Sequence, residues 1–286
     1  MKRPEAQFET KNAPNWCPGC GDFAVWQAFK EAAVEAKWHS HNTAIVAGIG
    51  CHGHMVNFLK IVAFEGLHGR ALPVATGIKL ANHDMNVFAF VGDGDCLAEG
   101  GNHFLHTARR NHNITVLLHD NAIYGLTTGQ TSPRTNKGQK TKSTPSGSIE
   151  EPIHPLRLAI AAGATFAARV YVGDIEKTKE IIIKANNHKG FAVVQMLQPC
   201  VTFNKVSSHE FYQQNTYWLP KEYDASDKLA ALAKTMEWGE GSIPVGVLYQ
   251  SDEPSYESLV PQLDGRPLVK QPLRKRNIKK TLEQFG

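Results

Sequence analysis

The sequence predicts an α/β fold, a parallel sheet flanked by helices, and three features of the pattern support this class. Short apolar runs recur at 87–91, 114–119 and 192–197, and they have the composition of strands that are buried on both faces. Segments of 10–15 residues with helical periodicity separate these runs. Strands that alternate with such helices are typical of right-handed crossover units, which place helices on both faces of a parallel sheet.

The first part of the chain is expected to supply two helices and the first strand. Apolar residues recur at helical spacing over 22–38, and Asp22 is a candidate N-cap for that helix. The apolar run at 45–49 predicts a short strand, and the segment 72–82 predicts a second helix. The glycines that follow the strand indicate that it runs directly into a turn.

The rest of the chain continues the alternation and then weakens. Further helices are expected over 99–111, near 155–163 and over 175–187, and further strands at 165–171 and 245–249. The stretch 127–152 is rich in Gly, Pro, Ser, Thr and Lys and has no periodicity, and a loop that long is usually functional or mobile. We therefore predict a domain over 1–205 that carries the functional sites, and a short, irregular C-terminal extension over 206–286.

Composition excludes several classes of protein. The chain has 286 residues, of which 42% are hydrophobic and 20% charged, unlike a collagen, a disordered tail or a disulfide-stapled miniprotein. Residues 270–286 carry a net charge of +5 and the other 269 residues carry −1, so the basic character belongs to a tail. No aromatic interleaving and no recognisable nucleic-acid module accompany this tail, so we expect no nucleic-acid partner.

We expect a soluble, cytoplasmic protein. The first residues contain no apolar core of a secretory signal, and no run approaches the roughly 18 apolar residues of a membrane-spanning helix. The five cysteines are an odd number, and in a cytosolic protein they argue against structural disulfides.

The most informative motif follows the strand at 87–91. It reads Gly92-Asp93-Gly94-Asp95, and the next predicted strand runs into Asp120-Asn121. Neighbouring parallel strands would bring both elements to the carboxyl edge of the sheet, where ligands bind. Glycines let backbone N–H groups approach phosphate oxygens, and an Asp, an Asn and a backbone carbonyl suit Mg²⁺. The tetrapeptide alone could be a simple acidic turn, but the two elements together favour a metal-bound diphosphate.

Four of the five cysteines are candidates for a metal centre. Cys17 and Cys20 form a Cys-x₂-Cys pair, and Cys51 and Cys200 follow far along the chain. The pair alone could serve zinc, an iron–sulfur cluster or a redox disulfide, although a thioredoxin-like disulfide does not fit a pair that precedes the first strand. The spacing favours a [4Fe–4S] cluster modestly over zinc, and a cluster beside the diphosphate would have a redox purpose. Cys96 is expected to be a small buried apolar residue.

Five ordered blocks of sequence carry a family resemblance. They are WCPGCG, GIGC, HGRALPVATGIKLAN, GDGDCLAEGGNHFLHTARRN and DNAIYGLTTGQTSP. Together they resemble the β subunit of 2-oxoacid:ferredoxin oxidoreductases over roughly residues 12–205, with a weaker likeness to about residue 260. The resemblance implies an oxidoreductase that decarboxylates a 2-oxoacid on thiamine diphosphate, with electrons passing through one [4Fe–4S] cluster to ferredoxin and coenzyme A taking the acyl group.

The resemblance also implies roles for individual residues. The cluster ligands would be Cys17, Cys20, Cys51 and Cys200. Magnesium would be held by Asp93, Asn121 and the carbonyl of Ile123. Contacts to thiamine diphosphate would come from Ile49, Gly50, Cys51, His52, His68, Gly92, Gly94, Asp95, Asn121, Tyr124, Gly125 and Leu126. The family usually has Asn where this chain has Asp120, which is a departure within the motif.

A few other residues are weaker candidates. His52 and His54 are the candidate catalytic residues, since a 2-oxoacid carboxylate needs hydrogen-bond donors, but two histidines in a polar loop are an equal alternative. Thr128 stands where some relatives have Lys, which weakens any transfer of substrate specificity. His103 and His106 lie at i, i+3 on a predicted helix, where a hydrogen-bonded helix face is expected rather than a metal pair.

The resemblance further implies that this chain holds only part of an active site. The family normally uses a carboxyl acid to activate the aminopyrimidine ring, and no domain here could supply it, so an α subunit would complete the site in an αβ or (αβ)₂ complex. Substrates would be the 2-oxoacid and coenzyme A, with 2-oxoglutarate favoured over pyruvate. Attraction of an acidic ferredoxin by the basic tail is a further hypothesis. Two other functions stay open: an electron-transfer subunit with a vestigial thiamine site, and half of a non-redox thiamine diphosphate lyase with a structural zinc.

Overall fold

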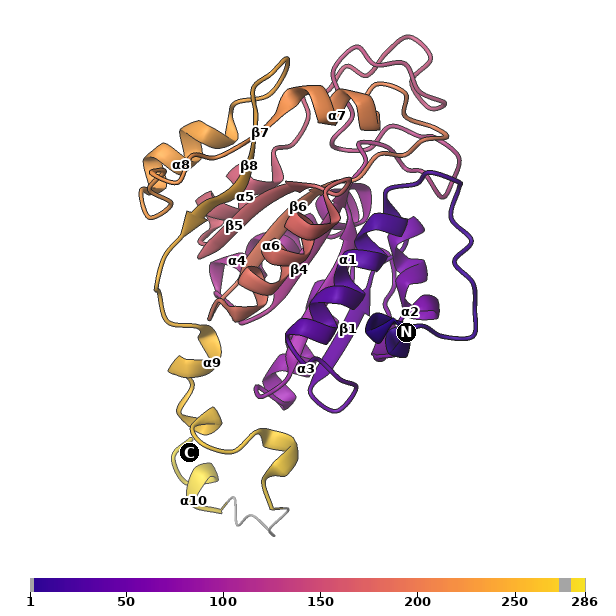
Figure 1. Cartoon of the computed structure of the whole chain (residues 1–286). Helices are drawn as coiled ribbons and strands as arrows, with labels where there is room; N and C mark the ends of the chain where they lie inside the picture. The colour runs from indigo at the N-terminus through magenta and orange to yellow at the C-terminus, as the bar shows by residue number, and fades with distance from the viewer. Residues whose placement is uncertain (1–2, 273–278, 286) are drawn as a thin grey trace.

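The computed structural model of the chain describes residues 3–272 and 279–285 (Figure 1). Its strands are β1 (Thr43–Ala47), β2 (Val62–Glu65), β3 (Asn86–Gly92), β4 (Thr115–Asp120), β5 (Phe166–Tyr171), β6 (Ala192–Leu197), β7 (Thr216–Trp218) and β8 (Ile243–Gln250). Its helices are α1 (Asp22–Glu35), α2 (Met55–Phe58), α3 (Ala71–Ala81), α4 (Gly101–Arg109), α5 (Pro155–Ala162), α6 (Ile175–Asn187), α7 (His209–Asn215), α8 (Lys228–Thr235), α9 (Tyr256–Leu259) and α10 (Lys279–Leu282). Short 3₁₀ turns and one π-helical turn, Asp95–Glu99, complete the described segments.

The described strands form one sheet in the order β2-β1-β3-β4-β6-β5-β8-β7. Neighbours are parallel except β5 and β8, which pair antiparallel with a register shift between Ala167 and Ala168. The register pairs Gly92 at the end of β3 with His119 near the end of β4. The residues that follow these two strands therefore emerge side by side at the carboxyl edge of the sheet.

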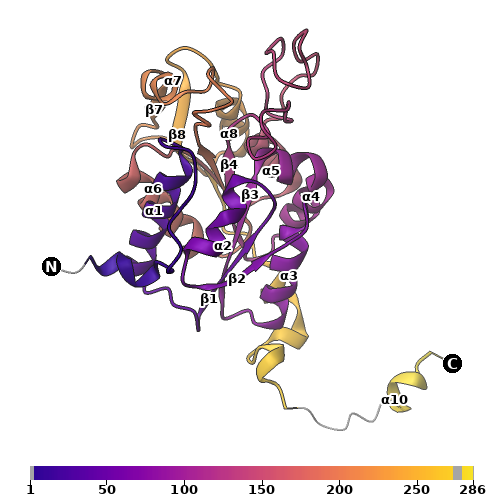
Figure 2. The same cartoon turned by 90° about the vertical axis from the view of Figure 1, so that its right-hand side faces the viewer.

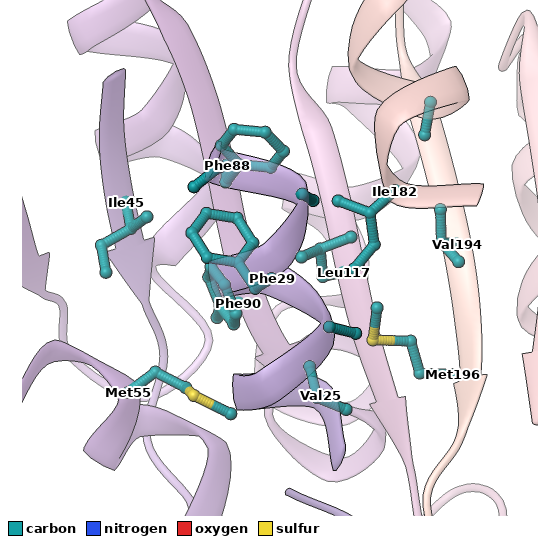
Figure 3. Close-up of a cluster of buried hydrophobic side chains, with 14 of the residues drawn as sticks. Val25, Phe29, Ile45, Met55, Phe88, Phe90, Leu117, Ile182, Val194 and Met196 are labelled. Atoms are coloured by element: carbon teal, nitrogen blue, oxygen red, sulfur yellow. The ribbon is translucent and has the colours of Figure 1, made fainter. Parts of the chain in front are cut away.

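Helices cover both faces of the sheet, as a mostly parallel sheet requires. Helices α1 and α6 pack on one face, and α3, α4 and α5 pack on the other (Figure 2). On the first face Phe29 of α1 lies over β3, with its ring 5.0 Å from that of Phe88 and 5.1 Å from that of Phe90, and all three are fully buried (Figure 3). This close-packed core gives the carboxyl edge a rigid support.

The predicted fold class is confirmed, and the main predicted strands and helices are present with shifted ends. The first strand ends at Ala47, and Ile49, which the prediction includes in it, lines a cavity instead. The helix expected over 99–111 begins at Gly101, after the π-helical turn. The sequence pattern did not reveal β2, whose residues are all exposed, or the short β7.

The prediction that Asp22 caps the first helix was wrong. The N-cap residue is Gly21, which makes no side-chain cap, and Asp22 is the first residue of α1. Its carboxylate is buried and accepts a hydrogen bond from Nδ1 of His119 at 2.7 Å. A carboxylate committed to a buried imidazole is not available to cap the helix.

The C-terminal part of the chain joins the same sheet through β8 and β7, so the boundary at residue 205 stays a prediction. The helix α9 and the described residues up to 272 lie beyond the end of the sheet opposite the carboxyl edge (Figure 1). Part of the basic tail, including Arg274, Lys275 and Arg276, lies outside the described residues, and Lys270 pairs with Asp84 at 2.7 Å. No helix in the described ranges is long and apolar enough to cross a membrane.

Candidate active site

One cavity at the carboxyl edge of the sheet is lined by the residues that the sequence motif indicated. Its walls come from the segments that follow β1, β3 and β4, together with His68 from the segment after β2. The lining consists of Ile49, Gly50, Cys51, His52, His68, Gly92, Asp93, Gly94, Asp95, Asn121, Ile123, Tyr124, Gly125, Leu126 and Thr127. Every residue expected to contact thiamine diphosphate or magnesium is in this set; the contacts themselves stay predictions.

Two of the three expected metal ligands, Asp93 and Asn121, are held by hydrogen bonds from more distant segments. Asp93 is buried, and the Ser132 hydroxyl donates to its Oδ2. The backbone of Asn121 is fixed by Asn204, whose Nδ2 donates to the Asn121 carbonyl at 2.8 Å, while Asn121 Oδ1 accepts from the N–H of Ile123 at 3.1 Å. The sites are thus supported by the loop after β4 and by the segment after β6.

The electrostatic surroundings of Asp93 suit a divalent cation. Burial and the neighbouring carboxylate of Asp120 raise the pKa of Asp93 to about 7. A cation bound between Asp93 and Asn121 would favour the ionised carboxylate, since an opposite charge stabilises the charged form. The donor set of one carboxylate, one amide oxygen and the Ile123 carbonyl therefore fits Mg²⁺ that also binds phosphate oxygens.

The glycines of the cavity allow approaches that no side chain would permit. A Cβ on Gly94 would lie 2.3 Å from the ring of Tyr124, and one on Gly92 would lie 2.7 Å from the ring of His52. Bare backbone at these positions, next to the π-helical turn that begins at Asp95, suits a diphosphate that binds backbone N–H groups. The backbone geometry of the cavity therefore also fits a bound diphosphate.

Asp95 ties three segments of the cavity wall together. Its Oδ1 accepts hydrogen bonds from the N–H of Ile49 at 3.1 Å, from the N–H of Gly69 at 2.7 Å and from Nδ1 of His68 at 2.9 Å. Burial acts to raise the pKa of Asp95, but His52 and these donors hold it below its usual range. Since the carboxylate is turned toward protein donors, its predicted cofactor contact would have to come from the backbone.

The four candidate cluster cysteines converge on a second cavity, of about 180 Å³. Cys17 is exposed, while Cys20, Cys51 and Cys200 are half-buried or buried. Burial and the neighbouring Asp22 raise the pKa of the Cys51 thiol to about 12, so in the protein without metal it is protonated at neutral pH. Bound iron would convert the thiols to thiolates, because a coordinating thiol is deprotonated.

One hydrogen-bond donor reaches a sulfur of this set, and a second reaches the backbone of Cys51, which fits a cluster. Gln198 Nε2 donates to Cys20 Sγ at 3.2 Å, and Trp16 Nε1 donates to the Cys51 carbonyl at 2.7 Å. Donors of this kind tune the potential of an iron–sulfur cluster. Within the described ranges no three His, Cys, Asp or Glu side chains are arranged to hold a single metal ion.

The two cavities share a wall. Cys51, Gly125 and Leu126 line both of them. A Cβ on Gly125 would lie 3.4 Å from Cys200 Sγ, 3.8 Å from Cys51 Sγ and 3.9 Å from Asn121 Nδ2. A single glycine thus separates a candidate metal ligand of the diphosphate site from two candidate ligands of the cluster.

The structure places the weaker candidate residues in different surroundings. His52 is buried in the first cavity, with Nε2 3.8 Å from Asp95 Oδ2, whereas His54 lines the cysteine cavity. His106 accepts a hydrogen bond from Arg109 at 3.4 Å on α4, and neither it nor His103 lines either cavity. Cys96 is buried in the apolar core, as the sequence predicted.

Several residues that support the site were not predicted from the sequence. Ser132 and Arg134 lie in the aperiodic loop after β4, and only the length of that loop signalled a function. Asn204 and the buried pair of Asp22 with His119 gave no signal, because each contact joins positions at least 83 residues apart.

Comparisons with known proteins agree with this geometry. Residues 48–196 match the family model for the thiamine pyrophosphate enzyme, C-terminal TPP binding domain, and residues 200–265 match the model for the C-terminal part of the pyruvate ferredoxin oxidoreductase beta subunit. A 2-oxoacid:ferredoxin oxidoreductase subunit beta from a Sulfolobus species is 42% identical over 260 residues, which cover 86% of this chain and 85% of the relative. The subunit beta of 2-oxoacid:ferredoxin oxidoreductase 2 from Aeropyrum pernix is 40% identical over 297 residues, covering 94% of this chain and 96% of the relative.

A solved structure extends the likeness to the fold. The 2-oxoglutarate:ferredoxin oxidoreductase from Magnetococcus marinus, determined with 2-oxoglutarate, coenzyme A and succinyl-CoA bound, contains a chain that matches with a TM-score of 0.91 at 34% identity. The match covers 99% of this chain and 96% of that chain. On these grounds this chain belongs to the family of 2-oxoacid:ferredoxin oxidoreductase β subunits, and it is part of an oxidoreductase.

Proposed function

We propose that this chain is the β subunit of a 2-oxoglutarate:ferredoxin oxidoreductase. With an α subunit it would convert 2-oxoglutarate and coenzyme A to succinyl-CoA and CO₂, and would pass the two electrons released through one [4Fe–4S] cluster to two molecules of ferredoxin. The observation that carries the proposal is the wall between the two cavities, where Gly125 adjoins both Asn121 and the cysteine sulfurs. Such proximity would serve electron transfer from the bound cofactor to the cluster during oxidation of the substrate, and it has no role in a non-redox lyase.

The residues of this chain would bind and orient the cofactor. Asp93, Asn121 and the Ile123 carbonyl would hold Mg²⁺, and the backbone around Gly94 would hold the diphosphate. Thiamine diphosphate bound there would supply the carbon nucleophile for the keto carbon and the electron sink that loss of CO₂ requires. The work of the protein is then orientation, electrostatics and the exclusion of water.

A partner chain is expected to close the cavity. Beside it, the edge strand β2 exposes Val62 and Phe64, each 52% accessible, and Leu67, 78% accessible, directly precedes the cavity residue His68. Large apolar side chains exposed on an edge strand, and next in sequence to a cavity residue, favour a protein partner there. This surface supports an α subunit that supplies the missing acid and part of the substrate pocket.

The substrate assignment rests on the solved relative, which was determined with 2-oxoglutarate and succinyl-CoA. Pyruvate is the second candidate, because the family model that matches residues 200–265 is named for pyruvate ferredoxin oxidoreductase. The two substrates differ by a second carboxylate. Comparing kcat/KM for the two acids in the αβ complex, with coenzyme A and ferredoxin present, decides between them.

Anaerobic purification of the αβ complex tests the proposal directly. We expect a brown protein with about four irons per β subunit and stoichiometric thiamine diphosphate. Asp93→Ala should lose thiamine diphosphate and keep the iron, and Cys51→Ser should lose the cluster, whereas the matched control Cys96→Ala should keep both. Iron without thiamine diphosphate would instead indicate an electron-transfer subunit, and a colourless protein with zinc would indicate the lyase half.

A further inference from the structure

A buried charge pair lies directly beside the candidate magnesium site. Asp120, the last residue of β4, and Arg134, in the loop after β4, are 1% and 3% exposed. Arg134 Nε donates to Asp120 Oδ2 at 2.8 Å, and Gln195 Nε2 donates to the same oxygen at 2.6 Å. In the described part of the structure Asp120 Oδ1 has no hydrogen-bond partner. Arg134 is therefore the main cation that offsets this carboxylate.

The arginine is held firmly in place. Its Nη1 donates to the Ile153 carbonyl at 2.8 Å, and its guanidinium carbon lies 4.8 Å from the ring centroid of Trp238. The guanidinium of Arg169 lies 5.3 Å from the same centroid, and its Nε donates to Gln195 at 2.9 Å. Asp120 thus sits in a network that joins β4, β5 and β6 to the loop.

The same loop reaches the metal ligand itself. The N–H of Arg134 donates to the Ser132 hydroxyl at 3.2 Å, and that hydroxyl donates to Asp93. Thr135 Oγ1 donates to the Ala122 carbonyl at 2.7 Å, next to the second metal ligand, Asn121. A loop segment of four residues therefore braces both ligands, and Arg134 anchors this segment in the interior.

The position of Asp120 makes a compensating cation important. Asp120 places a second buried carboxylate next to Asp93. A buried charge that loses its partner is strongly unfavourable, and two neighbouring carboxylates repel each other. A cation paired with Asp120 counters both effects and keeps the net charge beside Asp93 close to that of Asp93 alone.

We propose that Asp120 and Arg134 are a matched charge pair in which Arg134 is a positioning residue that sets the affinity of the site for Mg²⁺ and thiamine diphosphate. This inference rests on the proposed function, since it concerns the same cofactor. The inference goes beyond the proposed function because it assigns a role to two residues that would touch neither the metal nor the diphosphate. It also predicts that the two residues can be removed together but not singly.

The test measures cofactor affinity in the αβ complex, prepared anaerobically without Mg²⁺ and thiamine diphosphate. Titration calorimetry with thiamine diphosphate at fixed Mg²⁺ compares the wild type with Arg134→Met, Asp120→Asn and the double variant. Lys137→Met is the matched control, because it removes a cation from the same loop that pairs with Glu151 at an exposed position. The visible absorbance of the cluster reports whether each variant is folded.

Arg134→Met should weaken thiamine diphosphate binding by about ten-fold or more, since it leaves a buried carboxylate unpaired. The double variant should bind within about three-fold of the wild type, because the two changes compensate. The control should be unchanged, and all variants should retain the cluster. Recovery of affinity in the double variant is a result that a merely structural role for Arg134 would not produce.

Three results would count against the inference. Wild-type affinity in Arg134→Met would show that the charge is not needed, and a double variant as weak as Arg134→Met would show that Asp120 is not its partner. If Arg134→Met fails to fold, the double variant still distinguishes the two hypotheses. A charge pair predicts that the double variant folds and binds thiamine diphosphate, whereas a structural role for Arg134 alone predicts that the double variant does neither. A wild-type complex without affinity for thiamine diphosphate would overturn the proposed function itself, and the inference with it.

Discussion

Replacing Gly94 by alanine tests whether the bare backbone of the cavity is required for cofactor binding. Gly94 has φ −63° and ψ −52°, which alanine adopts without strain, so any effect must come from the new methyl group. That methyl group would lie 2.3 Å from Cε1 and 2.5 Å from Cζ of Tyr124. Carbon atoms in contact lie about 3.5–4.0 Å apart, so the ring must withdraw by about 1 Å or more.

The tyrosine has little freedom to withdraw. Its hydroxyl donates to the carboxylate of Glu99 at 3.1 and 3.2 Å, and its N–H donates to the Gln130 carbonyl at 2.9 Å. Overpacking of a fixed contact costs about 1–3 kcal/mol. If this cost falls on the cofactor-bound state, the dissociation constant for thiamine diphosphate rises by about 5- to 150-fold.

Calorimetric titration of the αβ complex with thiamine diphosphate and Mg²⁺ measures this effect. Gly101→Ala is the matched control, because nothing lies within 4 Å of its Cβ position, and it should leave the affinity unchanged. In a Tyr124→Ala background the added methyl group should have no further effect, since the ring that it meets is gone. Wild-type affinity in Gly94→Ala, or the same loss in the Tyr124→Ala background, would refute the reasoning.

Three further predictions concern stability, measured by urea unfolding. Phe29→Ala, in the fully buried core, should lower the free energy of unfolding by about 3–5 kcal/mol. The control Leu229→Ala, at a position that is 78% exposed, should change the free energy of unfolding by about 0.5 kcal/mol or less. Similar losses in the two variants would contradict the packing argument. Burial lowers the pKa of Lys79 from 10.5 to about 8, so the unfolded chain binds more protons between these values and stability rises with pH there. Lys79→Met should therefore stabilise the protein at neutral pH by up to about 3 kcal/mol, and a gain that did not shrink as the pH rises toward 10.5 would argue against this cause. Asp22→Ala should cost about 1.5–3 kcal/mol because it leaves the buried His119 Nδ1 without its acceptor, and the additional change His119→Leu should recover part of the loss.

The fold was predictable where burial leaves a trace in the sequence. β3, β4 and β6 are buried almost throughout, so their sequences are continuous apolar runs, and the helices between them carry an apolar stripe. β2 is an edge strand with every residue exposed, and β7 has three residues, so neither produces a run long enough to detect. The misassigned Asp22 has the same origin, because its partner lies 97 residues away and local sequence cannot reveal it.

The residues of the candidate site likewise divide into those that the sequence could predict and those that it could not. Residues that follow strand ends, such as Asp93 and Asn121, were predictable, because the geometry of a parallel sheet brings strand ends together whatever the connections are. Ser132 and Arg134 were not, because their positions depend on the path of an aperiodic loop. The departure at Asp120 was visible in the sequence, but only the structure shows the cation that accompanies it.

The order of the strands explains why the candidate ligands of the cofactor and of the cluster lie close together. Four neighbouring strands, β1-β3-β4-β6, end at one edge, and the residues just beyond them are Cys51, Asp93, Asn121 and Cys200 respectively. The two cysteines therefore flank the two candidate metal ligands Asp93 and Asn121, although they are far apart in the chain. The remaining pair, Cys17 and Cys20, lies just before α1. The Gly21 N–H donates a hydrogen bond to the Pro199 carbonyl at 3.2 Å, and this bond holds the start of α1 beside the end of β6. Because Cys51, Asp93, Asn121 and Cys200 each follow a different strand of one sheet, the strand order sets how far apart the two candidate sites lie.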